Sequence, residues 1–192
     1  MVYQHSGKRA LDLSLCTLML VPTLVVIITA GVLILLFDQM SPIFTSERVG
    51  VDGKCFKLFK LRTMKPSAPL VATGDFDDAK NWVTPLGRLL RKFSIDELPQ
   101  ILNIINGQMS LVGYRPALET QEWLNFERAR LGISQNRPGL TGLAQIKMRD
   151  LATDSDKIKY DLEYTGSMTL IGDLKILVDT IKVVCRGVAV KH

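Results

Sequence analysis

The chain has 192 residues, enough for one domain of ordinary size plus a short appendage. Its 24 basic residues against 19 acidic ones give a net charge of +5, which favours anionic partners such as phosphorylated substrates, lipid headgroups or nucleic acid. Aromatic residues make up only 7% and no basic run is interleaved with them, which argues against a stacking platform for single strands. Cys16, Cys55 and Cys185 are widely spaced, and His5 and His192 lie near the chain ends. A disulfide framework, a Cys/His zinc site and a serine–histidine nucleophile are therefore poorly supported, and a reducing cytoplasm fits best.

An uncharged apolar segment, residues 13–37, dominates the N-terminal part of the chain. As a straight helix these 25 residues would measure about 37 Å, enough to cross a hydrocarbon core of about 30 Å. Pro22 predicts a kink near the middle. Lys8 and Arg9 precede the segment and several basic residues follow it, so both ends favour the cytoplasmic side. From the residues alone, a simple span and a re-entrant helix that enters and leaves by one face both stay open, whereas a cleaved signal peptide is disfavoured.

Residues 43–64 predict a β-hairpin, because Asp52 and Gly53 form a strong turn signal between β-prone stretches. Residues 65–81 have the composition of a polar loop. Thr84 followed by Pro85 predicts the start of a helix, which continues through apolar residues at helical spacing: Leu86, Leu89, Leu90 and Phe93.

A second short helix is predicted to end at Asn106-Gly107 and to carry Leu98, Ile101, Leu102 and Ile105 on one face. Three further helices are predicted, at residues 119–131, 155–164 and 173–185. The stretch NRPGLTG, residues 136–142, is predicted to be a loop because it holds two glycines and a proline. These patterns indicate an α-rich α+β fold with a small β-hairpin and a membrane anchor.

Two adjacent acids, Asp96 and Glu97, stand in the stretch RKFSIDELPQILN. Ser94 with Glu97 matches a helix capping box, so one interpretation of the pair is a helix cap. Pro99 favours a helix that begins at Asp96 instead, because its missing N–H would matter at the fifth helical position. Such a start would expose the Asp96 carboxylate at the positive end of a helix, where it stays ionised and can bind a divalent cation or attack phosphorus.

A rival metal motif is DFDD, residues 75–78, whose Asp-x-Asp pattern resembles the metal-binding motif of nucleotide-sugar glycosyltransferases. The chain lacks room for the larger α/β domain of those enzymes, so a solvated loop is the preferred interpretation.

Several basic residues are candidates for binding phosphate. Arg115 and Arg137 each precede a proline that stiffens the adjoining backbone, and a guanidinium group can bind phosphate through two parallel hydrogen bonds. Arg88, Arg91 and Lys92 precede the acid pair, where they could equally solvate a helix face or contact lipid headgroups.

Taken together, these motifs resemble one family over nearly the whole chain: the bacterial sugar transferases, or monotopic phosphoglycosyl transferases. KRALDL resembles the start of the family's membrane helix, and FKLFKLRTM resembles its basic strand. TPLGRLLRKFSIDELPQILNIINGQMSLVGYRP resembles its catalytic core, while RPGLTGLAQI and GDLKIL resemble its C-terminal signatures. The chain departs from the usual pattern at Val21, Val49, Tyr114 and Leu143.

The resemblance implies a re-entrant membrane helix in residues 1–40 and a catalytic domain in residues 41–192, with amphipathic helices at the membrane interface. The domain is expected on the cytoplasmic face of the bacterial inner membrane, in contact with its lipids. The implied reaction moves a phosphosugar from a UDP-sugar to undecaprenyl phosphate and releases UMP. It would be the first membrane step of a surface glycan pathway, such as one that makes lipopolysaccharide.

The resemblance also implies roles for individual residues. Asp96 matches the family's nucleophile, which forms a covalent aspartyl-phosphosugar intermediate, and Glu97 matches its partner. Both are implied ligands of Mg²⁺, although Glu97 could instead deprotonate the lipid phosphate. Pro22 is the implied break of the membrane helix, and the implied substrate-binding residues are Arg62, Arg91, Arg115, Arg137 and Gly139.

Two non-enzymatic hypotheses stand beside this one. The chain could be a membrane-tethered scaffold of a glycan pathway, or a basic membrane-attached protein that binds nucleic acid. The preferred interpretation expects no nucleic-acid partner.

Overall fold

The computed structural model describes residues 3–69, 79–148 and 151–186. The strands within these ranges are β1 Ile43–Val49, β2 Cys55–Leu61, β3 Ser110–Val112 and β4 Gly139–Thr141. The helices of the described part are α1 Lys8–Leu33, α2 Ala79–Trp82, α3 Pro85–Lys92, α4 Ile101–Ile105, α5 Glu122–Arg130, α6 Leu143–Met148, α7 Asp154–Gly166 and α8 Leu170–Arg186. The predicted α-rich α+β class is therefore confirmed. The acidic stretch at residues 75–78 lies outside the described residues.

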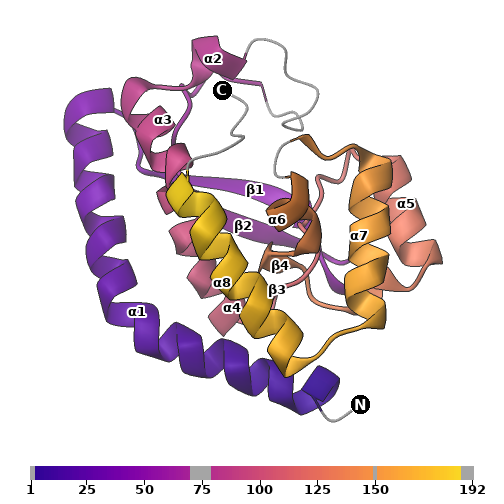
Figure 1. The fold of residues 1–192 in the computed structure, drawn as a ribbon. Coiled ribbons are helices and arrows are strands. Elements are labelled where there is room, and N and C mark those ends of the chain that lie inside the picture. The colour runs from indigo at the N-terminus through magenta and orange to yellow at the C-terminus, as the bar shows by residue number, and fades with distance from the viewer. Residues whose placement is uncertain (1–2, 70–78, 149–150, 187–192) are drawn as a thin grey trace.

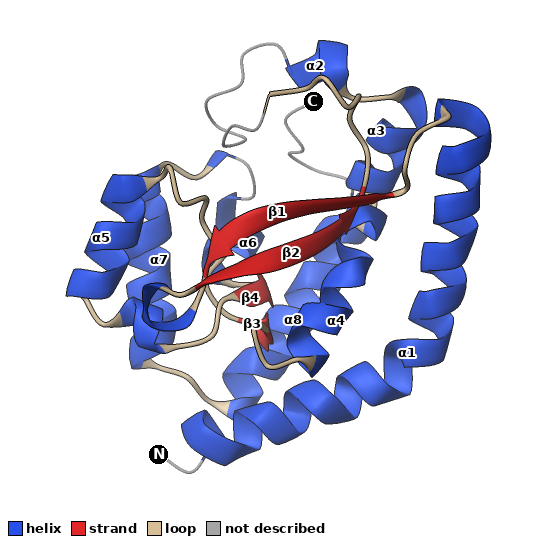
Figure 2. Ribbon diagram, turned by 180° about the vertical axis from the view of Figure 1, so that it is seen from behind, coloured by secondary structure: helices blue, strands red, loops and turns tan. Residues whose placement is uncertain are grey.

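Helix α1 frames the rest of the molecule. It runs beneath α4 and α8 and then turns to pass alongside α3, so its two halves point in different directions (Figures 1 and 2). Pro22 lies in the interior of this helix, where it removes a backbone donor and favours a kink. Short π-helical turns, Tyr3–Gly7 and Ile34–Asp38, extend it at the two ends. Long and apolar enough to cross a membrane, α1 leaves most of its apolar side chains exposed, with Leu18 at 73%.

The predicted β-hairpin is confirmed. Strands β1 and β2 pair antiparallel from Ile43↔Leu61 to Val49↔Cys55. The turn between them places Asp52 at φ 53° and Gly53 at φ 77°, the left-handed region that Asp and Gly tolerate best. The hairpin lies at the centre of the molecule, with α5 and α7 towards one end (Figure 2).

Helix α3 starts as predicted. Thr84 caps it by accepting a hydrogen bond from the Gly87 backbone N–H, and Pro85 occupies the first helical position. The predicted polar loop at residues 65–81 ends earlier than expected, because α2 begins at Ala79. The helix predicted at residues 119–131 is shorter, Glu122–Arg130, whereas α7 and α8 extend the other two predicted helices at both ends.

The prediction of a plain loop at residues 136–142 is wrong. Within it, β4 pairs in parallel with β3, in the register Ser110↔Gly139 and Val112↔Thr141. The two strands approach so closely that a Cβ atom on Gly139 would lie 2.1 Å from the backbone nitrogen of Gly113. A three-residue strand held by a distant partner leaves no local periodicity in the sequence, so pattern reading could not find it.

Both halves of α1 pack on the same domain. The first half contributes Cys16 to a core with Phe56, Leu58, Ile104 and Met109 from β2, α4 and the segment before β3. The second half contributes Ala30 and Ile34 to a core that also contains Met40, Leu61 and Leu90. The domain is thus built inside the bend of α1.

Candidate active site

Asp96 and Glu97 lie on a single 3₁₀ helix, Ile95–Gln100, which joins α3 to α4. Ser94, just before it, has φ 54° and its side chain makes no capping hydrogen bond, so the capping-box interpretation is wrong. The alternative of a helix beginning at Asp96 is also corrected: a tight 3₁₀ turn starts at Ile95 and accommodates Pro99 before the α-helix begins at Ile101. A positive-φ residue followed by a 3₁₀ turn reverses the chain sharply and aims the acid pair at strand β2.

The Asp96 side chain is more enclosed than expected, since the residue is only 7% exposed. Burial raises the pKa of its carboxyl above the ordinary value, against the opposing charges of Lys60, Arg91 and Arg115, and the charge of Glu97 adds to the rise. The expectation of an exposed carboxylate is therefore wrong. Three nearby cations are what favours the ionised form of this buried group.

Glu97 is held by two cations through one oxygen. Its Oε1 accepts hydrogen bonds from Lys60 Nζ at 2.8 Å and from Arg115 Nη2 at 2.9 Å. Burial alone would raise the pKa of Glu97, but Arg115 and Lys60 outweigh burial and hold the pKa of this carboxyl well below its usual range. Glu97 is therefore an anion, and its Oε2 is the oxygen that these two bonds leave available.

Lys60 is the site residue that sequence reasoning missed. It lies on β2 at two-residue spacing from the buried Phe56 and Leu58, so all three side chains share the face of the hairpin that meets the 3₁₀ helix. This spacing was the available signal, because a lysine that continues an inward-facing apolar row predicts a carboxylate partner on the element that packs against the strand.

Arg48 belongs to the same surroundings. It lies on β1 opposite Phe56 and donates to Ser46 Oγ at 3.2 Å and to the Pro116 carbonyl at 3.4 Å. Burial and the charge of Arg115 lower the pKa of its guanidinium to about 10, and the charge of Glu97 acts in the other direction. Arg48 therefore adds positive potential beside the acid pair.

Two of the predicted substrate-binding arginines are near the acid pair. Arg115 bonds Glu97 directly. Arg91, near the end of α3, donates from Nε to Thr63 Oγ1 at 3.0 Å, and its charge acts on Asp96. Both leave positive charge where an anionic substrate would approach the carboxylates.

The other predicted substrate-binding residues contact backbone instead. Arg62 lies at the base of the hairpin, where it donates to the carbonyl oxygens of Ser41 at 3.0 Å and of Ile43 at 3.4 Å. Arg137 donates from Nε to the Gly107 carbonyl at 2.8 Å. Gly139 is part of β4, and its close contact with Gly113 gives a packing reason for the glycine. Their assignment to substrate binding stays a prediction.

The segment that carries Arg115, residues 114–118, is held by its carbonyl groups. Five consecutive carbonyls accept hydrogen bonds from donors on three elements, β1, α5 and β4: Gly139 N to Tyr114, Arg128 Nη1 to Arg115, Arg48 Nη1 to Pro116, Val49 N to Ala117 and Asn125 Nδ2 to Leu118. Such a segment has little freedom to move without breaking several bonds at once. The backbone beneath Arg115 is therefore fixed, although 40% of its side chain is exposed.

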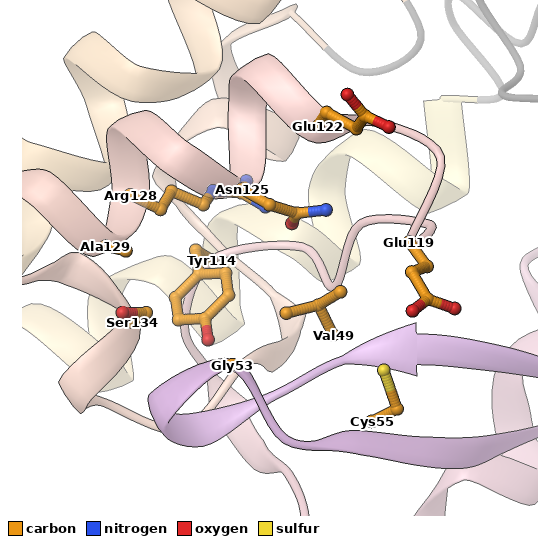
Figure 3. Close-up of a pocket in the computed structure, with 10 residues that line it drawn as sticks. All are labelled: Val49, Gly53, Cys55, Tyr114, Glu119, Glu122, Asn125, Arg128, Ala129 and Ser134. Atoms are coloured by element: carbon orange, nitrogen blue, oxygen red, sulfur yellow. The ribbon is translucent and has the colours of Figure 1, made fainter.

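A cavity of about 330 Å³ lies beside this segment, between the tip of the hairpin and α5 (Figure 3). Val49 and Cys55 line it from the strands, and Glu122, Asn125 and Arg128 line it from the helix. Asp96 and Glu97 are not among its lining residues. The cavity and the acid pair are therefore separate features.

The carboxylate oxygens of the acid pair are suitable ligands for Mg²⁺. Mg²⁺ is commonly held by one or two carboxylates, with substrate phosphate oxygens and water completing its shell. Asp96 and Glu97 supply such carboxylates on adjacent residues. Within the ranges that the structure describes, no group of three or more His, Cys, Asp or Glu side chains could form a dedicated protein cage for a metal.

Comparison with known proteins identifies the class. The family model described as "Bacterial sugar transferase" matches residues 3–187. The chain is 35% identical over 197 residues to the exopolysaccharide production protein ExoY of Rhizobium meliloti, an alignment that covers 93% of this chain and 85% of that protein. It is 36% identical over 185 residues to the UDP-glucose:undecaprenyl-phosphate glucose-1-phosphate transferase of Caulobacter vibrioides, covering 91% of this chain and 68% of that one. An Escherichia coli protein of the same name is 33% identical over 183 residues, which span 39% of its length.

The chain therefore belongs to the bacterial sugar transferase family. It is an enzyme, a transferase. The resemblance that its motifs indicated is confirmed, and the two non-enzymatic hypotheses are disfavoured.

Proposed function

We propose that this protein transfers a sugar 1-phosphate from a UDP-sugar to undecaprenyl phosphate and releases UMP. The names of several relatives describe this transfer, with glucose 1-phosphate as the group moved. The observation that carries the proposal is the acid pair, with Asp96 buried, under Lys60, Arg91 and Arg115. A diphosphate brings negative charge to the atom that a carboxylate must attack, and these cations offset that charge.

Asp96 is the nucleophile in this proposal. Among the described residues no hydrogen bond or ion pair engages its carboxylate, whereas Glu97 receives both Lys60 and Arg115. One Asp96 oxygen attacks the phosphorus that bears the sugar. The bond from that phosphorus to the bridging oxygen breaks, and UMP leaves with the bond's electron pair. The phosphosugar stays on the carboxylate as an acyl phosphate.

The second half of the reaction restores Asp96. An oxygen of undecaprenyl phosphate attacks the same phosphorus, the acyl–phosphate bond breaks, and the carboxylate is released together with a lipid diphosphate sugar. Splitting the transfer in two lets the nucleotide sugar and the lipid phosphate use the same cations in turn. Such an enzyme follows ping-pong kinetics.

Mg²⁺ is the proposed cofactor, and Asp96 and Glu97 would hold it. When bound it would neutralise phosphate charge as a Lewis acid. Lys60 and Arg115 meanwhile hold Glu97 as an anion and fix the orientation of its carboxylate. These two residues are thus expected to influence both the geometry of the pair and its affinity for a cation.

We also propose that α1 is re-entrant, entering and leaving the membrane by the cytoplasmic face. Both ends of the helix are bonded to the same domain. Near its start, Lys8 Nζ lies 2.7 Å from Asp173 Oδ2, and just after its end Asp38 Oδ2 accepts from Thr84 Oγ1 at 2.8 Å. A full span would separate these ends by about 30 Å of hydrocarbon. One of the two contacts would then have to break, which makes a bent helix on one face the simpler arrangement.

Exposed apolar side chains on other helices support a membrane-facing surface. Helix α8 carries basic Lys175 and Lys182 and an exposed apolar row, Ile171, Leu174, Val178 and Ile181. Helices α3 and α4 expose Leu89, Phe93, Leu102 and Ile105. Helices α4 and α8 lie next to the first half of α1 (Figure 1). Such amphipathic helices bind at a membrane interface by apolar burial and attraction to anionic lipids.

Labelling of the N-terminus tests the topology. Gln4→Cys on a background without Cys16, Cys55 and Cys185 should be protected from a membrane-impermeant thiol reagent in intact cells and react after permeabilisation. Labelling in intact cells would show a full span. Because Lys8 also holds the helix, Pro22→Ala alone should leave the N-terminus protected, and Pro22→Ala with Lys8→Met should expose a larger fraction.

The function itself is tested with purified protein, undecaprenyl phosphate and a panel of UDP-sugars, read by UMP release. At least one UDP-sugar should give UMP and a lipid-linked product. A folded protein that releases UMP from none of them, with Mg²⁺ present, would contradict the proposed reaction.

A further inference from the structure

The 114–118 segment rests on a buried ion pair that the proposed reaction does not use. Arg128 of α5 is 2% exposed and reaches Asp161 of α7 through two nitrogens, with Nη2 at 2.7 Å and Nε at 3.0 Å from Oδ2. Both residues lie on parts of the fold remote in sequence from the acid pair. A buried ion pair is weak evidence for a purely stabilising role, because apolar replacements are often as stable.

The third donor of Arg128 connects this pair to the site. Its Nη1 donates to the backbone carbonyl of Arg115 at 2.9 Å. Its guanidinium carbon lies 4.7 Å from the centre of the Tyr114 ring, whose hydroxyl in turn donates to the Gly50 carbonyl. Figure 3 shows Arg128 and Tyr114 side by side between α5 and the tip of the hairpin. One planar side chain thus fixes both the carbonyl of Arg115 and the ring that precedes it.

We propose that Arg128, oriented by Asp161, is a positioning residue that sets where the Arg115 guanidinium meets Glu97. The inference rests on the proposed function, because it gives Arg115 a part in the reaction. Arg115 Nη2 bonds Glu97 Oε1 from a side chain that is 40% exposed. Because the side chain extends from that backbone, a shift of the Arg115 backbone would move its end group relative to Glu97.

The geometry explains why arginine is needed at position 128. A lysine could keep the charge opposite Asp161, but its single nitrogen cannot serve Asp161 and the Arg115 carbonyl in the directions that a planar guanidinium spans. It would also lose the flat contact with Tyr114. Arg128→Lys should therefore loosen the segment while it keeps the buried charge paired.

A kinetic double-mutant cycle tests the proposal. Arg128→Lys should lower kcat/KM for the UDP-sugar at least tenfold per folded molecule, as judged by the thermal unfolding transition of the same sample. Arg115→Lys should lower it further. Their combination should be no worse than Arg115→Lys alone, because Arg128 acts through Arg115. Losses that multiply in the double variant, or wild-type kcat/KM in a folded Arg128→Lys protein, would overturn the proposal.

Helix α5 offers a matched control. Arg130 is two residues further on and pairs with Glu127 at the surface, 2.6 Å away. Arg130→Lys should leave kcat/KM at the wild-type value. Asp161→Asn is the second variant, should Arg128→Lys fail to fold. It keeps a neutral acceptor for Arg128 and should cause a severalfold loss that is absent from an Arg115→Lys background, whereas an equal loss in both backgrounds would overturn the proposal.

Hydrogen exchange gives a readout independent of turnover. The backbone N–H groups of residues 113–115, 117 and 118 should exchange faster in Arg128→Lys than in the wild type, and Arg130→Lys should leave them unchanged. Unaltered exchange in Arg128→Lys would count against the inference even if UMP release fell. If the wild type itself released no UMP, the proposed function would fail, while faster exchange would still report the positioning of the segment.

Discussion

Two clusters of charged side chains in this protein are built in opposite ways. In the anchor cluster, Tyr3, Lys8, Tyr164 and Asp173, one carboxylate is fully bonded: Asp173 Oδ2 accepts from Lys8 and Tyr3, and Oδ1 accepts from Tyr164. In the reaction cluster, Lys60, Arg91, Asp96, Glu97 and Arg115, two of the cations bond one oxygen of Glu97. The Asp96 side chain has no hydrogen bond to the described residues.

The difference fits the role that we propose for each cluster. In the anchor cluster one cation meets one anion, and each hydrogen-bonding atom has a partner, so it holds the start of α1 to α7 and α8. In the reaction cluster three cations surround two carboxylates, so positive charge remains for a ligand. A cluster in which every hydrogen-bonding atom has a partner favours stability. A cluster with surplus positive charge and a carboxylate that no side chain bonds favours ligand binding and chemistry.

The largest expected effect comes from Asp96→Asn. An amide cannot act as the nucleophile, so UMP release should fall by about 10⁴-fold or more while the unfolding midpoint changes little. The matched change in the anchor cluster, Asp173→Asn, should keep most of the UMP release per folded molecule. Comparable turnover in the two variants would remove the distinction between the clusters.

Removal of Mg²⁺ should come next in size. Chelation should stop UMP release, and adding Mg²⁺ back should restore it. Added Mg²⁺ should also raise the unfolding midpoint of the wild type, because a ligand that binds only the folded state stabilises it. This shift should persist in Asp173→Asn and vanish in Glu97→Gln; a shift that survives in Glu97→Gln would place the cation elsewhere.

The two clusters differ in how well the sequence predicts them. The adjacency of Asp96 and Glu97 and the proline-linked Arg115 are local signals, and they led to residues that do meet in the fold. Lys60 joins them only through strand alternation and the position of the 3₁₀ helix, which a sequence pattern does not fix. Burial of Asp96 was missed for the same reason, since it depends on what packs over the turn.

The anchor cluster was out of reach of sequence reasoning. Lys8 and Asp173 are 165 positions apart, and Lys8 looked like a flanking cation of the membrane helix. Asp12, whose Oδ1 accepts from Ser110 Oγ and the Leu111 backbone N–H, likewise gave no local sign of a partner. Long-range pairing of charges and of three-residue strands requires the fold itself.

A third prediction concerns stability. Asp173→Ala leaves Lys8 buried without its carboxylate, and breaking a buried ion pair in this way costs about 3 kcal/mol or more of unfolding free energy. Chemical denaturation in detergent should show this loss. The control is Asp179→Ala, which removes an exposed pair with Lys182 on the same helix and should cost far less unfolding free energy. Similar losses in both variants would mean that the anchor cluster contributes little.

The smallest effect is a dependence on alkaline pH. Burial, and then the charge of Asp173, raise the pKa of the Tyr164 hydroxyl above its ordinary value of 10.0. Below that value Tyr164 is protonated in both the folded and unfolded chain, so its contribution is complete. Above it the unfolded chain releases the proton first, and stability should fall by up to about 1.4 kcal/mol per pH unit for this group.

Tyr164→Phe isolates this contribution. Unfolding free energy measured between pH 8 and pH 11 should decline less steeply in Tyr164→Phe than in the wild type. A residual slope is expected, because burial and the bond to Asp173 also raise the pKa of Tyr3. Identical slopes would show that the Tyr164 proton is not held by the anchor cluster.

The central claim, that Asp96 carries the phosphosugar, is tested most directly by intact-protein mass spectrometry under cold, mild conditions. With the right UDP-sugar, Mg²⁺ and no lipid acceptor, the wild type should release UMP and gain the mass of one phosphosugar, which peptide mapping assigns to Asp96. Asp173→Asn should gain it too, and Asp96→Asn should not. UMP that appears only when a polyprenyl phosphate is present, with no adduct at any time, would contradict the account and favour direct transfer between the two substrates.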